Sequence, residues 1–81
     1  MNVWILTPEK TIYQGEASSL HVPGLDGSFQ LLDHHVSMVS VLKEGQITLC
    51  VSKIQKTDHL HFSIKSGLLE VKDNHVTIMI D

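Results

Sequence analysis

The stretch Leu20–Leu49, LHVPGLDGSFQLLDHHVSMVSVLKEGQITL, decides the fold of this chain. It contains two turn signals, a pair of adjacent histidines, and apolar residues that alternate with polar ones. Residues Pro23–Gly27 interrupt any regular element, because proline lacks an amide hydrogen and glycine accepts positive φ angles. Residues Lys43–Gly45 predict a hairpin turn. The stretch therefore predicts short β-strands joined by tight turns.

The same two-residue period continues outside this stretch. Alternation of this kind is typical of a strand with one face in a core and one face toward water or a partner. Turns are also expected at Thr7–Lys10 and, as a hairpin, at Lys72–Asn74, with a loop or hairpin tip at 53–57. The apolar members of the three clearest runs are Ile47, Leu49 and Val51; Leu60, Phe62 and Ile64; and Val76, Ile78 and Ile80.

Residues 31–42 are the only part of the chain that can also be drawn as a helix. Their β-branched valines, and the lack of a helix stop before Lys43, favour a turn at 33–35 followed by a strand. The chain then holds eight to ten short strands, with no repeat and no linker. We therefore predict one all-β domain over residues 1–81, a small antiparallel β-sandwich without a C-terminal helical domain.

Composition excludes several classes of partner. The net charge is −3, with six lysines and no arginine. Arginine is the usual reader of base edges and phosphates, so we expect no nucleic-acid binding, and direct adhesion to anionic lipid is disfavoured. The apolar runs are too short to cross a bilayer, and Met1–Trp4 lacks the basic start of a secretory signal. A cytoplasmic chain is expected.

No catalytic residue or cofactor site is predicted. Cys50 is the single cysteine, so no intrachain disulfide can form, and no base or cation stands beside it to activate the thiol. Asp33, His35 and Ser37 could be assembled into a triad on paper, but neighbours on one short segment point in divergent directions. Phosphate-binding glycine loops and nucleophile elbows are absent from the sequence.

Six histidines suggest a second class of protein, a small histidine-rich metal-binding β-sandwich. His59 and His61 are two residues apart and share one face of a strand, and His34, His35 and Asp33 could add ligands for zinc or copper. Nothing in the sequence brings the two pairs together, and a solvent-facing position for His59 and His61 is favoured. A third class, a carrier of a prosthetic group on Lys72, lacks the motif that usually surrounds such a lysine.

An ordered set of short motifs resembles a known family. The set is similar to the N-terminal β-sandwich domain of the epsilon subunit of F-type ATP synthase, over essentially the whole chain. The matching pieces are Ile5–Glu9, Tyr13–Glu16, Val22–Gly24, Asp26–Phe29, His35, Leu42–Gly45, Ser66–Val71 and Asn74–Ile78.

The resemblance implies a non-catalytic rotor subunit of the central stalk, which couples the gamma subunit to the polar loops of the c-ring. It implies a place on the cytoplasmic face of the inner (plasma) membrane, with membrane contact only through the complex. An exposed partner-binding face can also drive self-association of the isolated chain. The implied c-ring contacts are Ser28, Leu31, Leu32, Asp33, His34 and His35, and the implied gamma-subunit contacts are Ser40 and Leu42.

The chain departs from the family pattern at four places. One of them is Asp33-His34, where many members have Pro-Gly before the histidine. Many members carry an acidic residue where this chain has Ser28, which weakens the case for an ionic ring contact there. Val36-Ser37 replaces the usual Ala-Pro after the histidine. Typical members continue past the position of Asp81 into two C-terminal helices that brake ATP hydrolysis, so the resemblance implies a short form that neither brakes by this route nor binds ATP.

Overall fold

The computed structural model describes residues 1–81 and consists of nine β-strands with no helix. This confirms the predicted all-β class and the predicted number of strands. Without a helix, the chain holds no helical segment that could cross a membrane. The strands are β1 (Asn2–Leu6), β2 (Thr11–Glu16), β3 (Ser19–Val22), β4 (Phe29–Leu32), β5 (Met38–Leu42), β6 (Gly45–Lys53), β7 (Lys56–Ile64), β8 (Gly67–Lys72) and β9 (His75–Ile80).

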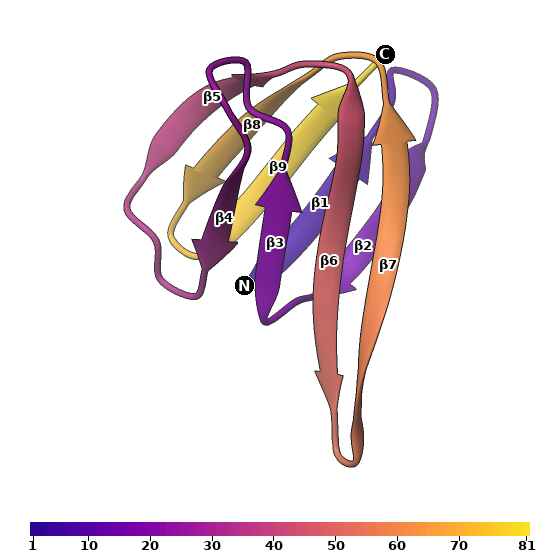
Figure 1. Cartoon of the computed structure of the whole chain (residues 1–81), viewed down its shortest axis with the longest axis vertical. Coiled ribbons are helices and arrows are strands. Elements are labelled where there is room, and N and C mark those ends of the chain that lie inside the picture. Colours follow the sequence, from indigo (N-terminus) through magenta and orange to yellow (C-terminus); the bar gives the residue numbers. More distant parts are fainter.

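The strands form two sheets that face each other as a sandwich (Figure 1). One sheet has five strands in the order β2-β1-β9-β8-β5, and the other has four in the order β4-β3-β6-β7. All neighbours are antiparallel except β1 and β9, which run parallel. The predicted antiparallel β-sandwich is confirmed, and β1 with β9 is its one parallel pair. No hairpin joins β1 to β9, so no short connection imposes the antiparallel direction.

The core lies between the sheets and contains only apolar side chains. In each predicted run the alternation gives the correct inward face, although Val51, Leu60, Phe62 and Ile80 are only partly buried. Full burial of one such aliphatic side chain contributes about 1.5–3 kcal/mol. The buried core residues are Met1, Val3, Ile5, Ala17, Leu20, Val22, Leu31, Leu42, Ile47, Leu49, Ile64, Leu69, Val71, Val76 and Ile78.

Two predicted turns close hairpins. In the β1–β2 turn, the Thr7 amide donates to the Lys10 carbonyl at 2.8 Å, and the Thr7 hydroxyl oxygen accepts from the Lys10 amide at 3.1 Å. In the β8–β9 turn, Asp73 and Asn74 have φ angles of 51° and 61°. Two successive positive φ angles define a type I′ turn, whose twist matches that of the flanking strands.

The hairpin predicted at Lys43–Gly45 is wrong. The residues on either side belong to different sheets, because β5 pairs with β8 and β6 pairs with β3 and β7. The turn therefore carries the chain across the core from one sheet to the other. It is held by the Lys43 amide, which donates to the Pro23 carbonyl at 2.9 Å. A short glycine-containing turn suits either connection, so its sequence does not tell them apart.

The sandwich has two distinct ends (Figure 1). One end, called here the N end, carries the N-terminus, the β4–β5 connection (33–37) and the β8–β9 turn (73–74). The β6–β7 hairpin projects beyond the body on the same side, with Ile54 at its tip wholly exposed. The opposite end carries the C-terminus, the β1–β2 turn and the β3–β4 loop (23–28). Strand β4 therefore separates Ser28 from Asp33, His34 and His35, although the resemblance implies that all four contact the c-ring.

Candidate docking surfaces

The outer surface of the five-stranded sheet carries a continuous apolar patch, called here the apolar face. Its members are Val39 and Val41 on β5, Leu68 on β8 and Met79 on β9, which are 65%, 50%, 46% and 47% exposed. Val41 pairs with Leu68, and Leu68 pairs with Met79, so three adjacent strands contribute one unbroken row. Directly paired residues have Cβ atoms about 4.5–5.5 Å apart. Single exposed apolar residues are ordinary, whereas a contiguous patch marks an interaction surface.

The apolar face continues around the sheet edge into a groove beside β5. The groove has a volume of about 310 Å³ and is bordered by the β3–β4 loop. The loop is fixed there, because the Leu25 amide donates to the Val41 carbonyl at 2.9 Å. This contact leaves the Leu25 side chain 58% exposed next to the valines. The groove is lined by Gly24, Leu25, Asp26, Gly27, Phe29, Val39, Ser40 and Val41.

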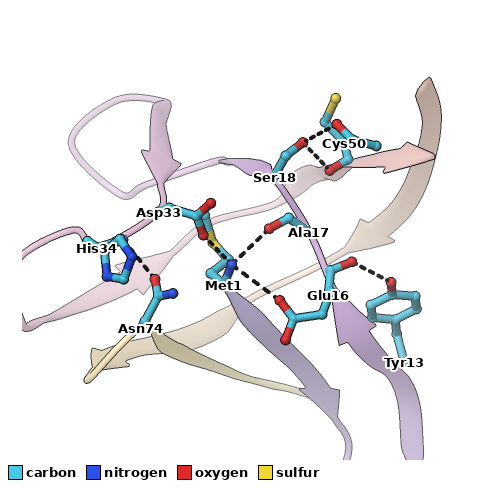
Figure 2. Close-up of polar contacts among 10 residues, drawn as sticks. Met1, Tyr13, Glu16, Ala17, Ser18, Asp33, His34, Cys50 and Asn74 are labelled. Atoms are coloured by element: carbon cyan, nitrogen blue, oxygen red, sulfur yellow. Dashed lines mark hydrogen bonds and ion pairs between the residues drawn. The ribbon is translucent and has the colours of Figure 1, made fainter. Parts of the chain in front are cut away.

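A polar cluster lies at the N end (Figure 2). The α-ammonium of Met1 donates to the Ala17 carbonyl at 3.0 Å and to the Asp33 carboxylate, and it lies 3.5 Å from a Glu16 carboxylate oxygen. The hydrogen bond from this ammonium holds the pKa of Asp33 below its ordinary value, and burial of the carboxylate works in the opposite direction. Asp33 is therefore a fixed anion at the start of the β4–β5 loop.

His34, the next residue of the loop, adopts a backbone conformation that is uncommon for residues other than glycine. His34 has a φ angle of 62°, and its amide donates to the Asn74 side-chain oxygen at 2.8 Å. In the following residue, His35, the ring nitrogen Nδ1 lies 2.9 Å from the Val36 carbonyl oxygen. Nδ1 donates to this oxygen in the tautomer that carries the proton on Nδ1. Both imidazoles belong to exposed residues. The loop therefore presents polar side chains to solvent on a backbone that its contacts fix.

The structure brings together only part of the predicted c-ring contact set. Leu32, Asp33, His34 and His35 gather at the N end, and all four are exposed. Ser28 is also exposed but lies at the opposite end, beyond β4. The prediction for Leu31 is wrong, because this side chain is 0% exposed and packs in the core.

The predicted gamma-subunit contacts are also divided. Ser40 is half-buried and lines the groove beside β5. Leu42 is 1% exposed, so its side chain belongs to the core and the prediction of a contact there is wrong. Sequence reasoning missed the outward residues of the same strand, Val39 and Val41. Their signal was present: β5 is apolar on both faces, which is typical of a strand that is covered on both sides.

The histidines do not assemble a metal site. His59 and His61 are exposed on β7 at the edge of the four-stranded sheet, and Nδ1 of His61 lies 3.1 Å from the Thr48 hydroxyl. His34 and His35 lie in the β4–β5 connection instead. No group of three or more His, Cys, Asp or Glu side chains lies close enough together to hold a metal ion. The metal-binding alternative therefore has no geometric support.

Comparison with known proteins gives consistent results. A family model described as "ATP synthase, Delta/Epsilon chain, beta-sandwich domain" matches residues 1–81. An ATP synthase epsilon chain from Leptospira borgpetersenii is 42% identical over 82 residues, which cover all of this chain. One from Protochlamydia amoebophila is 39% identical over 77 residues, which cover 95% of this chain. The chain spans 61% and 50% of the lengths of these two relatives.

A solved structure confirms the architecture. A chain in the cryo-EM structure of the central stalk and c-ring of Tetrahymena thermophila mitochondrial ATP synthase superposes with a TM-score of 0.80 at 19% identity. The match covers 98% of this chain and 61% of the other. At this level of identity the likeness concerns the fold alone.

Proposed function

The chain belongs to the ATP synthase delta/epsilon family, as defined by the β-sandwich domain of these subunits, and we propose that it is a non-catalytic rotor subunit of an F-type ATP synthase. In this role it joins the gamma subunit to the c-ring, so that proton-driven rotation of the ring reaches the catalytic head. The role puts the chain on the cytoplasmic face of the inner (plasma) membrane, bound there only through the complex. Epsilon chains of the same family supply the precedent.

The observation that carries this proposal is the apolar face of the five-stranded sheet. A rotor clamp needs a rigid body with an adhesive surface, and Val39, Val41, Leu68 and Met79 supply such a surface on a sandwich with an all-apolar core. Stable interfaces bury about 1,200–2,000 Å² in total and combine an apolar centre with a polar rim. We assign the apolar face and the adjoining groove with Ser40 to the gamma subunit.

We assign the c-ring contact to the exposed residues of the N end, Leu32, Asp33, His34 and His35. Their polar groups suit the polar loops of c subunits, and their backbone is fixed by the contacts of Asp33 and His34. Ser28 precedes β4, whereas Asp33, His34 and His35 follow it, so Ser28 belongs to the loop at the opposite end of this strand. We keep Ser28 as the competing position, to be separated by experiment.

The gamma assignment is tested by placing a charge on the apolar face. Leu68→Asp puts a carboxylate at its centre, and Gln46→Asp is the matched control on an exposed interior-strand position of the other sheet. We expect Leu68→Asp to lower the gamma subunit recovered with the tagged chain by about tenfold or more, because an unpaired carboxylate is costly to bury and each 1.4 kcal/mol is tenfold in affinity. Equal recovery from both variants would reject the assignment.

The ring assignment is tested in the same assembled rotor. Changing Asp33 and His35 together to alanine is expected to lower recovery of the c-ring while recovery of gamma stays unchanged. The isolated chain is expected to keep its β-sandwich fold and to lose only the stability that the Met1–Asp33 contact contributes. The matched variant changes Asp26 and Ser28, in the β3–β4 loop at the opposite end, to alanine. If only this second variant loses the c-ring, the ring contact lies at the opposite end and our assignment is wrong.

A further inference from the structure

The amino-terminal nitrogen is an integral part of the N end of the sandwich (Figure 2). Met1 is only 4% exposed. Its α-ammonium donates to the Ala17 carbonyl at 3.0 Å, and the Ala17 amide donates back to the Met1 carbonyl at 2.9 Å. Met1 therefore continues the antiparallel pairing of β1 with β2 by one residue. A cation at such a position is tolerated only when anions or carbonyl oxygens replace its lost water.

Asp33 is the main anionic partner of this ammonium. Its carboxylate accepts a direct hydrogen bond from the Met1 nitrogen, whereas the Glu16 oxygen lies 3.5 Å away on a side chain that is 80% exposed. The Asp33 side chain is 51% exposed and thus more enclosed. The direction of the Asp33 pKa, lowered chiefly by the hydrogen bond from the ammonium, agrees with this geometry. Glu16 contributes a weaker, solvated contact.

The contact joins the N-terminus to a strained loop. Asp33 directly precedes His34, whose positive φ is uncommon for a residue other than glycine. The His34 amide donates to the Asn74 side chain at 2.8 Å, and the Asn2 amide donates to the Asn74 carbonyl at 3.0 Å. Segments from both sheets therefore meet at one point. The loop is thus held at two successive residues: the Met1 ammonium binds the Asp33 carboxylate, and the Asn74 side-chain oxygen accepts from the His34 amide.

We propose that the α-ammonium of Met1 is a structural cation that fixes the conformation of the 33–37 loop, and that acylation of this nitrogen releases the loop. An acyl group removes the positive charge, leaves a single N–H, and places a carbonyl carbon where Asp33, Ala17 and Glu16 converge. The Asp33 carboxylate then faces a neutral amide in place of a cation. It can replace the lost interaction only by rotating toward water. His34 loses one of the two supports that keep its backbone at positive φ.

The test uses the full chain with three chemical states of its amino terminus. Native ligation at Cys50 joins residues 1–49, carrying a free, formylated or acetylated Met1 nitrogen, to residues 50–81. Acetylation of the Lys10 side chain is the matched control, because Lys10 is exposed and lies in the turn at the opposite end. Two quantities are measured by NMR: hydrogen exchange of the His34 amide and the pKa of the Asp33 carboxyl.

We expect acylation of Met1 to accelerate exchange of the His34 amide several-fold and to return the pKa of Asp33 toward 3.8. The Leu49 amide, in the middle of β6, and the chain acetylated at Lys10 are expected to keep their native values. In an Asp33→Asn background, acylation is expected to add less than it does in the native chain, since the ion pair is already absent. Glu16→Gln is expected to change little.

Two results would overturn the inference. If His34 exchange and the Asp33 pKa are the same with a free and an acylated nitrogen, the ammonium has no role in fixing the loop. If exchange at Leu49 rises in parallel with exchange at His34, the ammonium supports the whole fold and not the loop in particular. Both measurements are made on the isolated chain, so their outcome is independent of any partner in the rotor.

Discussion

At the scale of residues, three residues other than glycine have left-handed backbone conformations, and all three lie at the N end. They are His34, Asp73 and Asn74. Asparagine and aspartate tolerate this region better than other residues with a Cβ, so Asp73 and Asn74 suit their type I′ turn. His34 also belongs to the residue types found there, and its amide donates a hydrogen bond to the Asn74 side chain. One side chain therefore serves a turn in one sheet and a loop from the other.

This double role of Asn74 can be divided by two substitutions. Asn74→Gly keeps the backbone conformation available and removes only the hydrogen bond to His34. Asn74→Ala removes the same bond and adds the penalty of a positive φ, so we expect it to lower the free energy of unfolding by about 1–2 kcal/mol more than glycine does. Urea unfolding of both variants measures the difference. Equal stability of the two would show that the turn adopts another conformation.

Asp33 gives stability a specific dependence on pH. Its pKa is lower in the folded chain than its ordinary value of 3.8, mainly through the hydrogen bond from the ammonium. A lowered pKa means that the contribution is present above about pH 4 and is lost as pH falls through the folded-state pKa. We expect the urea midpoint of the native chain to fall more steeply below about pH 4 than that of Asp33→Asn. Parallel acid profiles for the two would contradict this.

At the scale of elements, the sequence predicts faces better than partners. The two-residue period correctly places Leu49 inward. This prediction is robust, because a shift of one residue would turn every apolar side chain of the strand toward solvent. The same period carries no information about which strand lies alongside. The crossing at Lys43–Gly45 and the parallel pairing of β1 with β9 therefore escaped prediction. Both depend on contacts between residues far apart in the chain.

Strand β6 offers a direct check of the alternation. Leu49 is fully buried, and its neighbour Cys50 is half-buried on the opposite face. We expect Leu49→Ala to cost about 2–5 kcal/mol, through lost burial and a residual cavity, and Cys50→Ser to cost less than about 1 kcal/mol. Denaturant unfolding of both variants measures the two values. A larger loss from the cysteine change would mean that the register of β6 is shifted by one residue.

At the scale of the whole molecule, the sequence predicted the kind of body but only part of its surfaces. The motif resemblance led to the loop residues Asp33–His35, which the structure does gather at one end. It also included Leu31 and Leu42, which are apolar and near the right place but face the core. The apolar face escaped notice because its row runs across β5, β8 and β9, which are distant in sequence. The Met1–Asp33 contact escaped for the same reason.

An uncovered apolar face has a consequence for the isolated chain. We expect the native chain to associate with itself at high protein concentration, since the row from Val41 to Met79 has no partner. Leu68→Asp is expected to keep it monomeric, because two copies would each have to bury an unpaired carboxylate. Sedimentation over a range of concentrations measures this, with Gln46→Asp as the control. A native chain that stays monomeric throughout would contradict the expectation.

The strand order of the larger sheet also sets when this protein can be completed during synthesis. Its two halves, β2-β1 and β8-β5, are joined only through β9, which is inserted between them. Until residues 75–80 have left the ribosome, β1 and β8 each present an open edge, and such edges invite pairing with other chains. The nascent polypeptide must therefore wait for its ninth strand before the sheet closes, which makes closure of this sheet a long-range event.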